Sequence, residues 1–150
     1  MSPAEHLERR LGHRFRDPAL LERALTHASY ANEHPPCAHN EALAFVGDAA
    51  LGLVVAERLF AADPLAPVGV LTPRRAALVS GAALAQWAAS LDLGALLRLG
   101  RGEEQTGGRA RESILATTLE AVLGAVYLES GLDGLRPLVA RLAAASAPAC

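Results

Sequence analysis

The sequence of 150 residues has no lysine and only two cysteines, and aromatic residues make up only 4% of it. All fourteen basic residues are therefore arginines, so any contact with phosphate must come from forked guanidinium groups. The missing lysines do not require a functional explanation, because a compositional bias of the source explains them equally well. Cys37 and Cys150 are too few and too scattered for a disulfide framework or a zinc site. This scarcity favours a reducing cytoplasm and leaves the role of both cysteines open.

Signals for export and for membrane insertion are also missing. Charged residues come as early as Glu5 and Glu8, which argues against a signal peptide at the start. The longest uncharged stretch, residues 76–91, falls short of a membrane span. The formal net charge of −2 gives no general attraction to nucleic acid. We therefore expect a soluble, cytoplasmic protein with no membrane partner.

Alanine, leucine and valine are abundant, and hydrophobic residues make up 51% of the sequence. With so few aromatic residues, the core must be built mainly from these three. Alanine and leucine are strong helix formers, and alternating runs of β-branched residues are nearly absent. The composition therefore predicts an all-α protein. The length predicts a single domain over residues 1–150, with a frayed tail at about 146–150.

Proline, glycine and capping residues divide the chain into predicted helices. The first helix is expected to begin near Pro3 and to stop at Gly12, and Asn40 is the predicted N-cap of a long helix. The predicted helices cover 3–12, 17–30, 41–60, 74–90 and 112–129, and a last one reaches about Ala145. Loops are predicted at 34–40, 62–69 and 100–113.

Carboxylates within apolar helices require an explanation. Glu41, Ala44 and Asp48 share one face of the long helix, because a helix turns by about 100° per residue. Glu120 is the single acidic residue of the apolar run 113–128 and is costly to bury unpaired. If Asp48 and Glu120 face each other, they share a proton or hold a divalent cation, for which all-oxygen ligands favour Mg²⁺ or Mn²⁺. The alternative is that each acid lies at the solvent-facing edge of its helix.

Three long stretches carry a family resemblance. The stretch HNEALAFVGDAALGLVVAERLF (39–60) resembles the signature helix of the ribonuclease III family. Residues 7–30 resemble the first two helices of that family, and GEEQTGGRARESILATTLEAVLGAVYLESG (102–131) resembles its second motif. The resemblance implies an all-helical endonuclease domain that cuts double-stranded RNA as a homodimer with Mg²⁺.

The resemblance also implies a metal site that this chain only partly retains. Its four acids correspond to the positions of Ala44, Asp48, Thr117 and Glu120, and a further family acid corresponds to Val68. Asp48 and Glu120 are thus the expected metal ligands and catalytic residues. Glu41 matches an outer glutamate that is expected to assist. Since Mg²⁺ demands well-placed oxygen ligands, two carboxylates predict weak binding of Mg²⁺ or Mn²⁺ and weak or lost cleavage.

Contacts with RNA and with a second subunit are the remaining expectations. Family members usually carry a separate double-stranded RNA-binding domain, which these 150 residues do not contain. RNA contact is therefore expected from arginines in and near the glycine-rich loop and on the helix before it, chiefly Arg101, Arg109, Arg111 and Arg74, with Arg98 and Arg75 nearby. A solvated charged loop fits the same residues. Phe45 matches the aromatic residue that locks the family's subunits together, although an ordinary core position is the alternative.

Three functions follow. The first is a metal-dependent endonuclease that processes double-stranded or structured RNA. The second is a catalytically silent dimer that binds such RNA or a ribonucleoprotein. The third is a dimerisation partner of an active relative, for which RNA contact is incidental.

Overall fold

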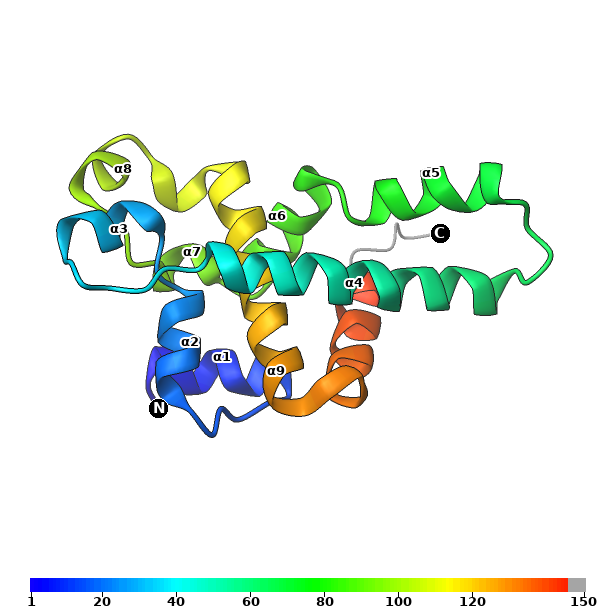
Figure 1. The fold of residues 1–150 in the computed structure, drawn as a ribbon, viewed down its shortest axis with the longest axis horizontal. Coiled ribbons are helices and arrows are strands. Elements are labelled where there is room, and N and C mark those ends of the chain that lie inside the picture. The colour runs from blue at the N-terminus through cyan, green and yellow to red at the C-terminus, as the bar shows by residue number, and fades with distance from the viewer. Residues whose placement is uncertain (146–150) are drawn as a thin grey trace.

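The protein is described by a computed structural model in which residues 1–145 are placed (Figure 1). Over these residues the chain forms helices and no strand, with one isolated bridge between Thr26 and Arg98. The all-α prediction is confirmed. The predicted frayed tail at 146–150 lies outside the described residues. The helices are α1 (Pro3–Leu11), α2 (Pro18–Ala24), α3 (Ala28–Glu33), α4 (Glu41–Ala62), α5 (Val68–Leu78), α6 (Gly81–Ser90), α7 (Leu93–Leu96), α8 (Arg101–Gln105), the 3₁₀ turn η1 (Gly108–Ala110) and α9 (Glu112–Ala145).

The first helices begin and end where capping chemistry dictates. Ser2 accepts a hydrogen bond from the backbone of Glu5, whose carboxylate accepts one from the Ser2 backbone, so that α1 begins with a capping box. Gly12 ends α1 in the left-handed conformation at φ 67°, which suits glycine. Asp17 caps α2 by accepting from the Ala19 backbone.

The centre of the fold is the crossing of α4 and α9, where two glycines let the backbones touch. A Cβ added to Gly47 would lie 1.7 Å from the carbonyl oxygen of Glu120. A Cβ added to Gly124 would lie 2.3 Å from the carbonyl oxygen of Leu43. Neither position therefore has room for any side chain, and the two helices cross at the closest approach that backbones permit.

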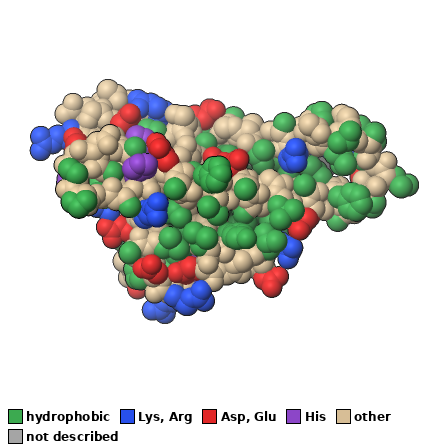
Figure 2. Space-filling view, viewed as in Figure 1, with side chains coloured by type: hydrophobic (Ala, Val, Ile, Leu, Met, Phe, Trp, Pro, Cys, Tyr) green, Lys and Arg blue, Asp and Glu red, His purple; other side chains and the backbone are tan. Residues whose placement is uncertain are grey.

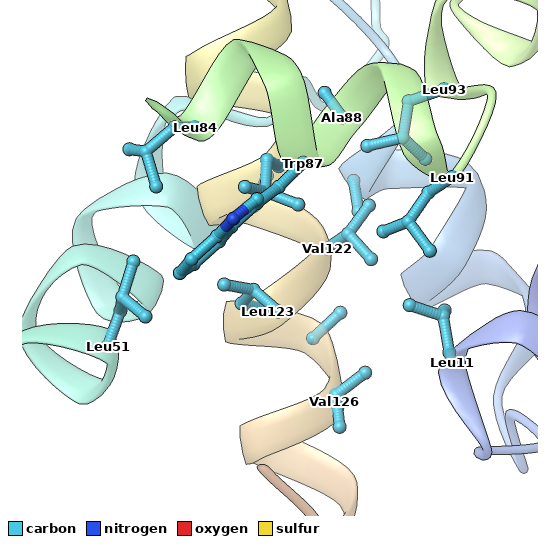
Figure 3. Close-up of a cluster of buried hydrophobic side chains, with 14 of the residues drawn as sticks. Leu11, Leu51, Leu84, Trp87, Ala88, Leu91, Leu93, Val122, Leu123 and Val126 are labelled. Atoms are coloured by element: carbon cyan, nitrogen blue, oxygen red, sulfur yellow. The ribbon is translucent and has the colours of Figure 1, made fainter. Parts of the chain in front are cut away.

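The core surrounds this crossing. Trp87 of α6 lies between Leu51 of α4 and Leu123 of α9 (Figure 3). Most of the first half of α9 is buried, in a continuous run from Leu119 to Val126 broken only by Glu120. By length and composition α9 could cross a membrane, but 61% of its most apolar window is buried inside the fold. Its hydropathy is that of a core helix.

One part of the molecule stands away from the core. The C-terminal half of α4 and all of α5 form a hairpin that projects from the body (Figure 1). None of the residues of α5 is buried. Large hydrophobic side chains are exposed along the hairpin, among them Leu65 at 95% and Val68 at 75%. The hairpin is thus held from one side only within a single chain.

Several predicted boundaries were wrong, each for a local reason. The predicted helix 17–30 is two helices, because Thr26 leaves the helix and its carbonyl accepts a hydrogen bond from the Asn40 backbone. The predicted helix 74–90 is α5 and α6, which are separated because Ser80 caps a new helix by accepting from Ala83. The predicted loop 100–113 contains α8 and η1. The break predicted after residue 129 is confirmed, because Gly131 is non-helical at φ 65° and kinks α9 there.

Asn40 does not cap α4 through its side chain. Its Nδ2 donates to the carbonyl of Ala24 instead, and the residue is only 1% exposed. The ring nitrogen Nδ1 of His39 accepts the backbone N–H of Glu41 in its place. Asn40 therefore joins the start of α4 to the end of α2, which is a tertiary role that a capping pattern does not reveal.

The segment before α2 is tied to the middle of α9 by Glu129. This buried carboxylate accepts from the backbones of Arg16 and Asp17 at 2.9 Å and lies 2.8 Å from Nε2 of His13. Burial alone would raise the pKa of Glu129, but the two amide donors and His13 outweigh it and hold the pKa below its ordinary value. A single acid thus fixes the turn between α1 and α2 on the core helix.

The glycine crossing leads to a matched test of stability. Gly47→Ala is expected to lower the free energy of unfolding by about 3 kcal/mol, because the new methyl group overlaps the Glu120 carbonyl. Gly52→Ala in the same helix meets no atom within 4 Å and is expected to raise it by up to about 1 kcal/mol through helix propensity. Urea unfolding of both variants measures the difference. Equal stability of the two variants would show that the crossing is loose.

Candidate functional site

The helix crossing brings two predicted site residues together. Asp48 follows Gly47 directly, and Gly47 lies against the Glu120 backbone, so the two acids come side by side from α4 and α9. Their carboxyl groups lie within hydrogen-bonding reach of each other, and such a bond forms when one of the two is protonated. Asp48 is exposed and Glu120 is half-buried. Two helices that are far apart in sequence, α4 and α9, therefore place these acids within reach of each other, as expected from the sequence.

The pair is electrostatically unusual. Burial raises the pKa of Glu120 to about 7. The protonated Glu120 carboxyl can donate a hydrogen bond to Asp48, and this bond and the negative charge of Asp48 add to the effect. A proton shared between two carboxyl groups is the usual result when like charges meet without a cation. The two acids thus behave as one unit that carries fewer than two negative charges near neutral pH.

The neighbouring positions add no further acid to the pair. Ala44 is buried with 8% exposure, and Thr117 is half-buried with a neutral hydroxyl. Glu41 lies exposed at the first turn of α4. Among residues 1–145, no group of three or more histidine, cysteine, aspartate or glutamate side chains is arranged to hold a metal ion. The donor set therefore does not fit the four-acid Mg²⁺ site that the resemblance implies.

A surface hollow opens beside the pair, between α4 and α5. Its volume is about 460 Å³, and its two charged lining residues are Asp48 and Arg75. The rest of the lining is small or apolar: Ala49, Gly52, Leu53, Ala56 and Val79. Arg75 also lines a second hollow of about 270 Å³ further along the hairpin, together with Val68. A cation and an anion thus face one cavity at the edge of the site.

Two of the arginines predicted to bind RNA hold their own loop together. Nη1 of Arg109 donates to the carbonyls of Gly94 at 3.0 Å and Leu97 at 2.7 Å, and its other nitrogens pair with Glu104. Arg111 forms an ion pair with Glu103 and donates to the carbonyl of Thr106. Both guanidinium groups are therefore already occupied within the chain.

The other two predicted arginines lie apart from each other. Arg101 is exposed at the start of α8, where both oxygens of Glu33 accept its backbone N–H at 3.1 Å. Arg74 lies on α5, 3.7 Å from Asp63. Figure 1 places α8 and α5 at opposite ends of the molecule, so these arginines do not form one patch on a single chain. The role of Glu33 as the anchor of α8 had no signal in the sequence.

Phe45 is 80% exposed on α4, which excludes an ordinary core position within one chain. Val46 beside it is half-buried, and Leu53 two turns later is exposed. Figure 2 shows hydrophobic side chains gathered over α4 and along the projecting hairpin. An exposed apolar surface of this kind is typical of a face that another macromolecule covers.

Comparison with known proteins gives a consistent answer. A family model for ribonuclease-III-like domains matches residues 17–145. Ribonuclease 3 of Streptomyces coelicolor is 55% identical over 136 residues, which cover 91% of this chain and 49% of that protein. Ribonuclease 3 of Heliobacterium modesticaldum is 51% identical over 142 residues, which cover 93% of this chain and 60% of that protein. The chain thus spans between half and three fifths of the length of these relatives.

Solved structures agree with the sequences. The nuclease domain of ribonuclease III from Campylobacter jejuni superposes with a TM-score of 0.87 at 39% identity, covering 100% of this chain and 99% of that one. Another structure of that domain, with a TM-score of 0.86 and 41% identity over 92% of this chain and 94% of that one, shows structural flexibility in the region involved in dimer formation. Dicer from Pichia stipitis gives a TM-score of 0.63 at 28% identity, covering 88% of this chain and 58% of that one.

The pKa of Glu120 predicts how stability depends on pH. Because the folded-state pKa near 7 exceeds the ordinary value of 4.5, the cost of ionising Glu120 sets in as pH rises above about 4.5 and is complete above 7. Glu120→Gln removes this cost, so it is expected to raise the melting temperature at pH 8 by about 2–4 °C and to change it little at pH 5. The measurement is thermal unfolding across that range without added metal.

Asp133→Asn is the matched control, since this side chain on α9 is fully exposed. It is expected to show no such change between pH 5 and pH 8. A melting temperature that Glu120→Gln shifts equally at both values would contradict the shared proton.

Proposed function

The chain belongs to the ribonuclease-III-like family, and from that premise we propose that it binds double-stranded RNA as a homodimer and cuts it weakly or not at all. The observation that carries the proposal is the Asp48–Glu120 pair. The two helices that would carry a family metal site bring Asp48 and Glu120 together, yet two of its four acids are replaced by Ala44 and Thr117.

The loss of acids bears directly on the chemistry. Hydrolysis of a phosphodiester requires an activated water molecule and neutralisation of the charge that develops on the phosphate, which divalent cations supply in metallonucleases. A hard cation is drawn from water by negative charge and by correctly placed oxygens. Asp48 and Glu120 supply two of the four acids, so they offer less of both. We therefore assign no cleavage step to this pair, and Glu41 has no ion to assist.

The exposed face of α4 supports the homodimer. Phe45 is exposed near the start of α4, and an isologous pairing would cover this side chain in both subunits. The hairpin exposes further apolar side chains, among them Leu65 and Val68. A dimer would cover surface that a single chain leaves in water at a cost in free energy.

RNA contact follows from shape and charge rather than from base reading. Duplex RNA is recognised through its backbone and its shallow minor groove, so no base-reading side chains are required. Arg101 is exposed and has no ion-pair partner among residues 1–145, so it is available for a phosphate. Arg109 and Arg111 instead support the loop from which Arg101 projects.

Restoring the missing acids tests the catalytic part. The purified chain and the double variant Ala44→Glu, Thr117→Asp are incubated with long duplex RNA, first with Mg²⁺ and then with Mn²⁺. The double variant is expected to cut more than about 100-fold faster than the parent, because the cation is then held where it acts. Fragment length on a denaturing gel is the measurement.

Other outcomes separate the competing functions. Efficient cutting by the parent would show an active endonuclease with two acids. Salt-sensitive binding of duplex RNA by a parent that does not cut would support the silent dimer. If the parent neither binds nor cuts, a dimerisation partner of an active relative is the function that remains.

The dimer has its own test. Phe45→Ala is expected to weaken dimerisation at least about 30-fold, since a buried aromatic residue at the centre of an interface commonly contributes 2 kcal/mol or more. Leu128→Ala, which removes an exposed leucine from α9, is the control and is expected to leave dimerisation unchanged. Sedimentation equilibrium over a range of protein concentrations measures both. A monomeric parent at all concentrations would rule out the proposed assembly.

A further inference from the structure

We infer that Arg75 binds an RNA phosphate in the hollow between α4 and α5, and that the chain therefore binds duplex RNA without a divalent cation. The inference rests on the proposed RNA binding and adds to it a specific residue and independence from metal. The hollow lies beside Asp48, where the family resemblance implies a cation between the protein and the phosphate.

The first argument is that Arg75 is free and faces the site. Its side chain lines the same hollow as Asp48, but no hydrogen bond or ion pair engages it within residues 1–145. The adjacent Arg74 differs, because it lies 3.7 Å from Asp63 at the tip of the hairpin. The sequence presents two neighbouring arginines, and the structure turns only Arg75 toward the carboxylate pair.

The second argument concerns what surrounds Arg75. Val68 lies beside it in the second hollow, at a position where the family resemblance implies an acid. An acid there would add a negative charge that competes for the guanidinium, whereas valine adds none. The walls formed by Leu53, Ala56 and Val79 are apolar, so they offer the guanidinium no competing hydrogen-bond or ion-pair partner.

The third argument is the charge of the site. A cluster of four or five acids repels a phosphate unless cations neutralise it. Here Ala44, Thr117 and Val68 stand at three of those positions, so that Asp48 and Glu120 are the acids that remain of the five. The guanidinium of Arg75, which lines the same hollow as Asp48, offsets part of their negative charge. The phosphate is attracted by Arg75 directly, with a fork of N–H donors that suits its oxygens.

The test measures affinity for a duplex RNA as a function of salt, in EDTA and in Mg²⁺, with the full chain. The parent is expected to bind as tightly in EDTA as in Mg²⁺, or more tightly, since Mg²⁺ competes as a counterion. Arg75→Gln is expected to weaken binding about 10-fold and to lower the slope of log K against log salt by about one for each protomer. Arg74→Gln is the matched control and is expected to stay within about twofold of the parent.

Two further variants probe the charge argument. Asp48→Asn is expected to tighten binding in EDTA about threefold, because it removes a negative charge next to the phosphate. Val68→Glu is expected to weaken binding in EDTA, because it adds a negative charge to the hollow that Arg75 also lines. Circular dichroism and melting curves establish that each variant is folded.

The outcomes separate this inference from the proposed function. Binding that requires Mg²⁺, or that Asp48→Asn weakens, would overturn metal independence while leaving RNA binding intact. Equal losses for Arg74→Gln and Arg75→Gln would overturn the specific role of Arg75. No binding by the parent in either buffer would overturn the proposed RNA binding itself, and the inference with it.

Discussion

The contact between the backbones of α4 and α9 at Gly47 and Gly124 is the constraint on which the rest of the molecule depends. It excludes any side chain between the helices, so it fixes their separation and their rotation about each other. Asp48 and Glu120 come together because each is at or next to a residue of that contact. The same crossing leaves the opposite face of α4, with Phe45, open to solvent. The carboxylate pair and the exposed apolar face of α4 thus both follow from the way in which α4 packs against α9.

On this scaffold, a few side chains decide what the site can do. The geometry of the crossing is that of a family of nucleases, whereas the donor set is not that of a site for a hard cation. Ala44 fills its place with a methyl group, and burial beside Asp48 raises the pKa of Glu120 to about 7. The balance of charge then shifts toward Arg75. Under the proposed function, a small number of substitutions would move this surface from metal chemistry to phosphate binding without altering the fold.

The sequence was a reliable guide to whatever depends on helical periodicity and long motifs. It located α4 and α9 and the acids that they bring together, because both helices are long and their apolar positions recur at helical spacing. It failed where tertiary contacts override local signals. Asn40 resembles a cap but joins two segments of the chain, and Arg109 resembles a ligand for phosphate but binds carbonyls of its own loop. No pattern separates Arg74 from Arg75, since only the path of α5 past α4 does so.

The lack of any buried residue in α5 has a thermodynamic consequence. This helix forms one wall of the hollow that holds Arg75, and within one chain it is supported only on the side that faces α4 and α6. If a second subunit supports the other side, then closing the hollow and joining two chains are coupled equilibria, and each must favour the other. RNA would favour dimerisation by mass action. Dilution of the protein would lower the apparent affinity for RNA even when every contact to phosphate is intact.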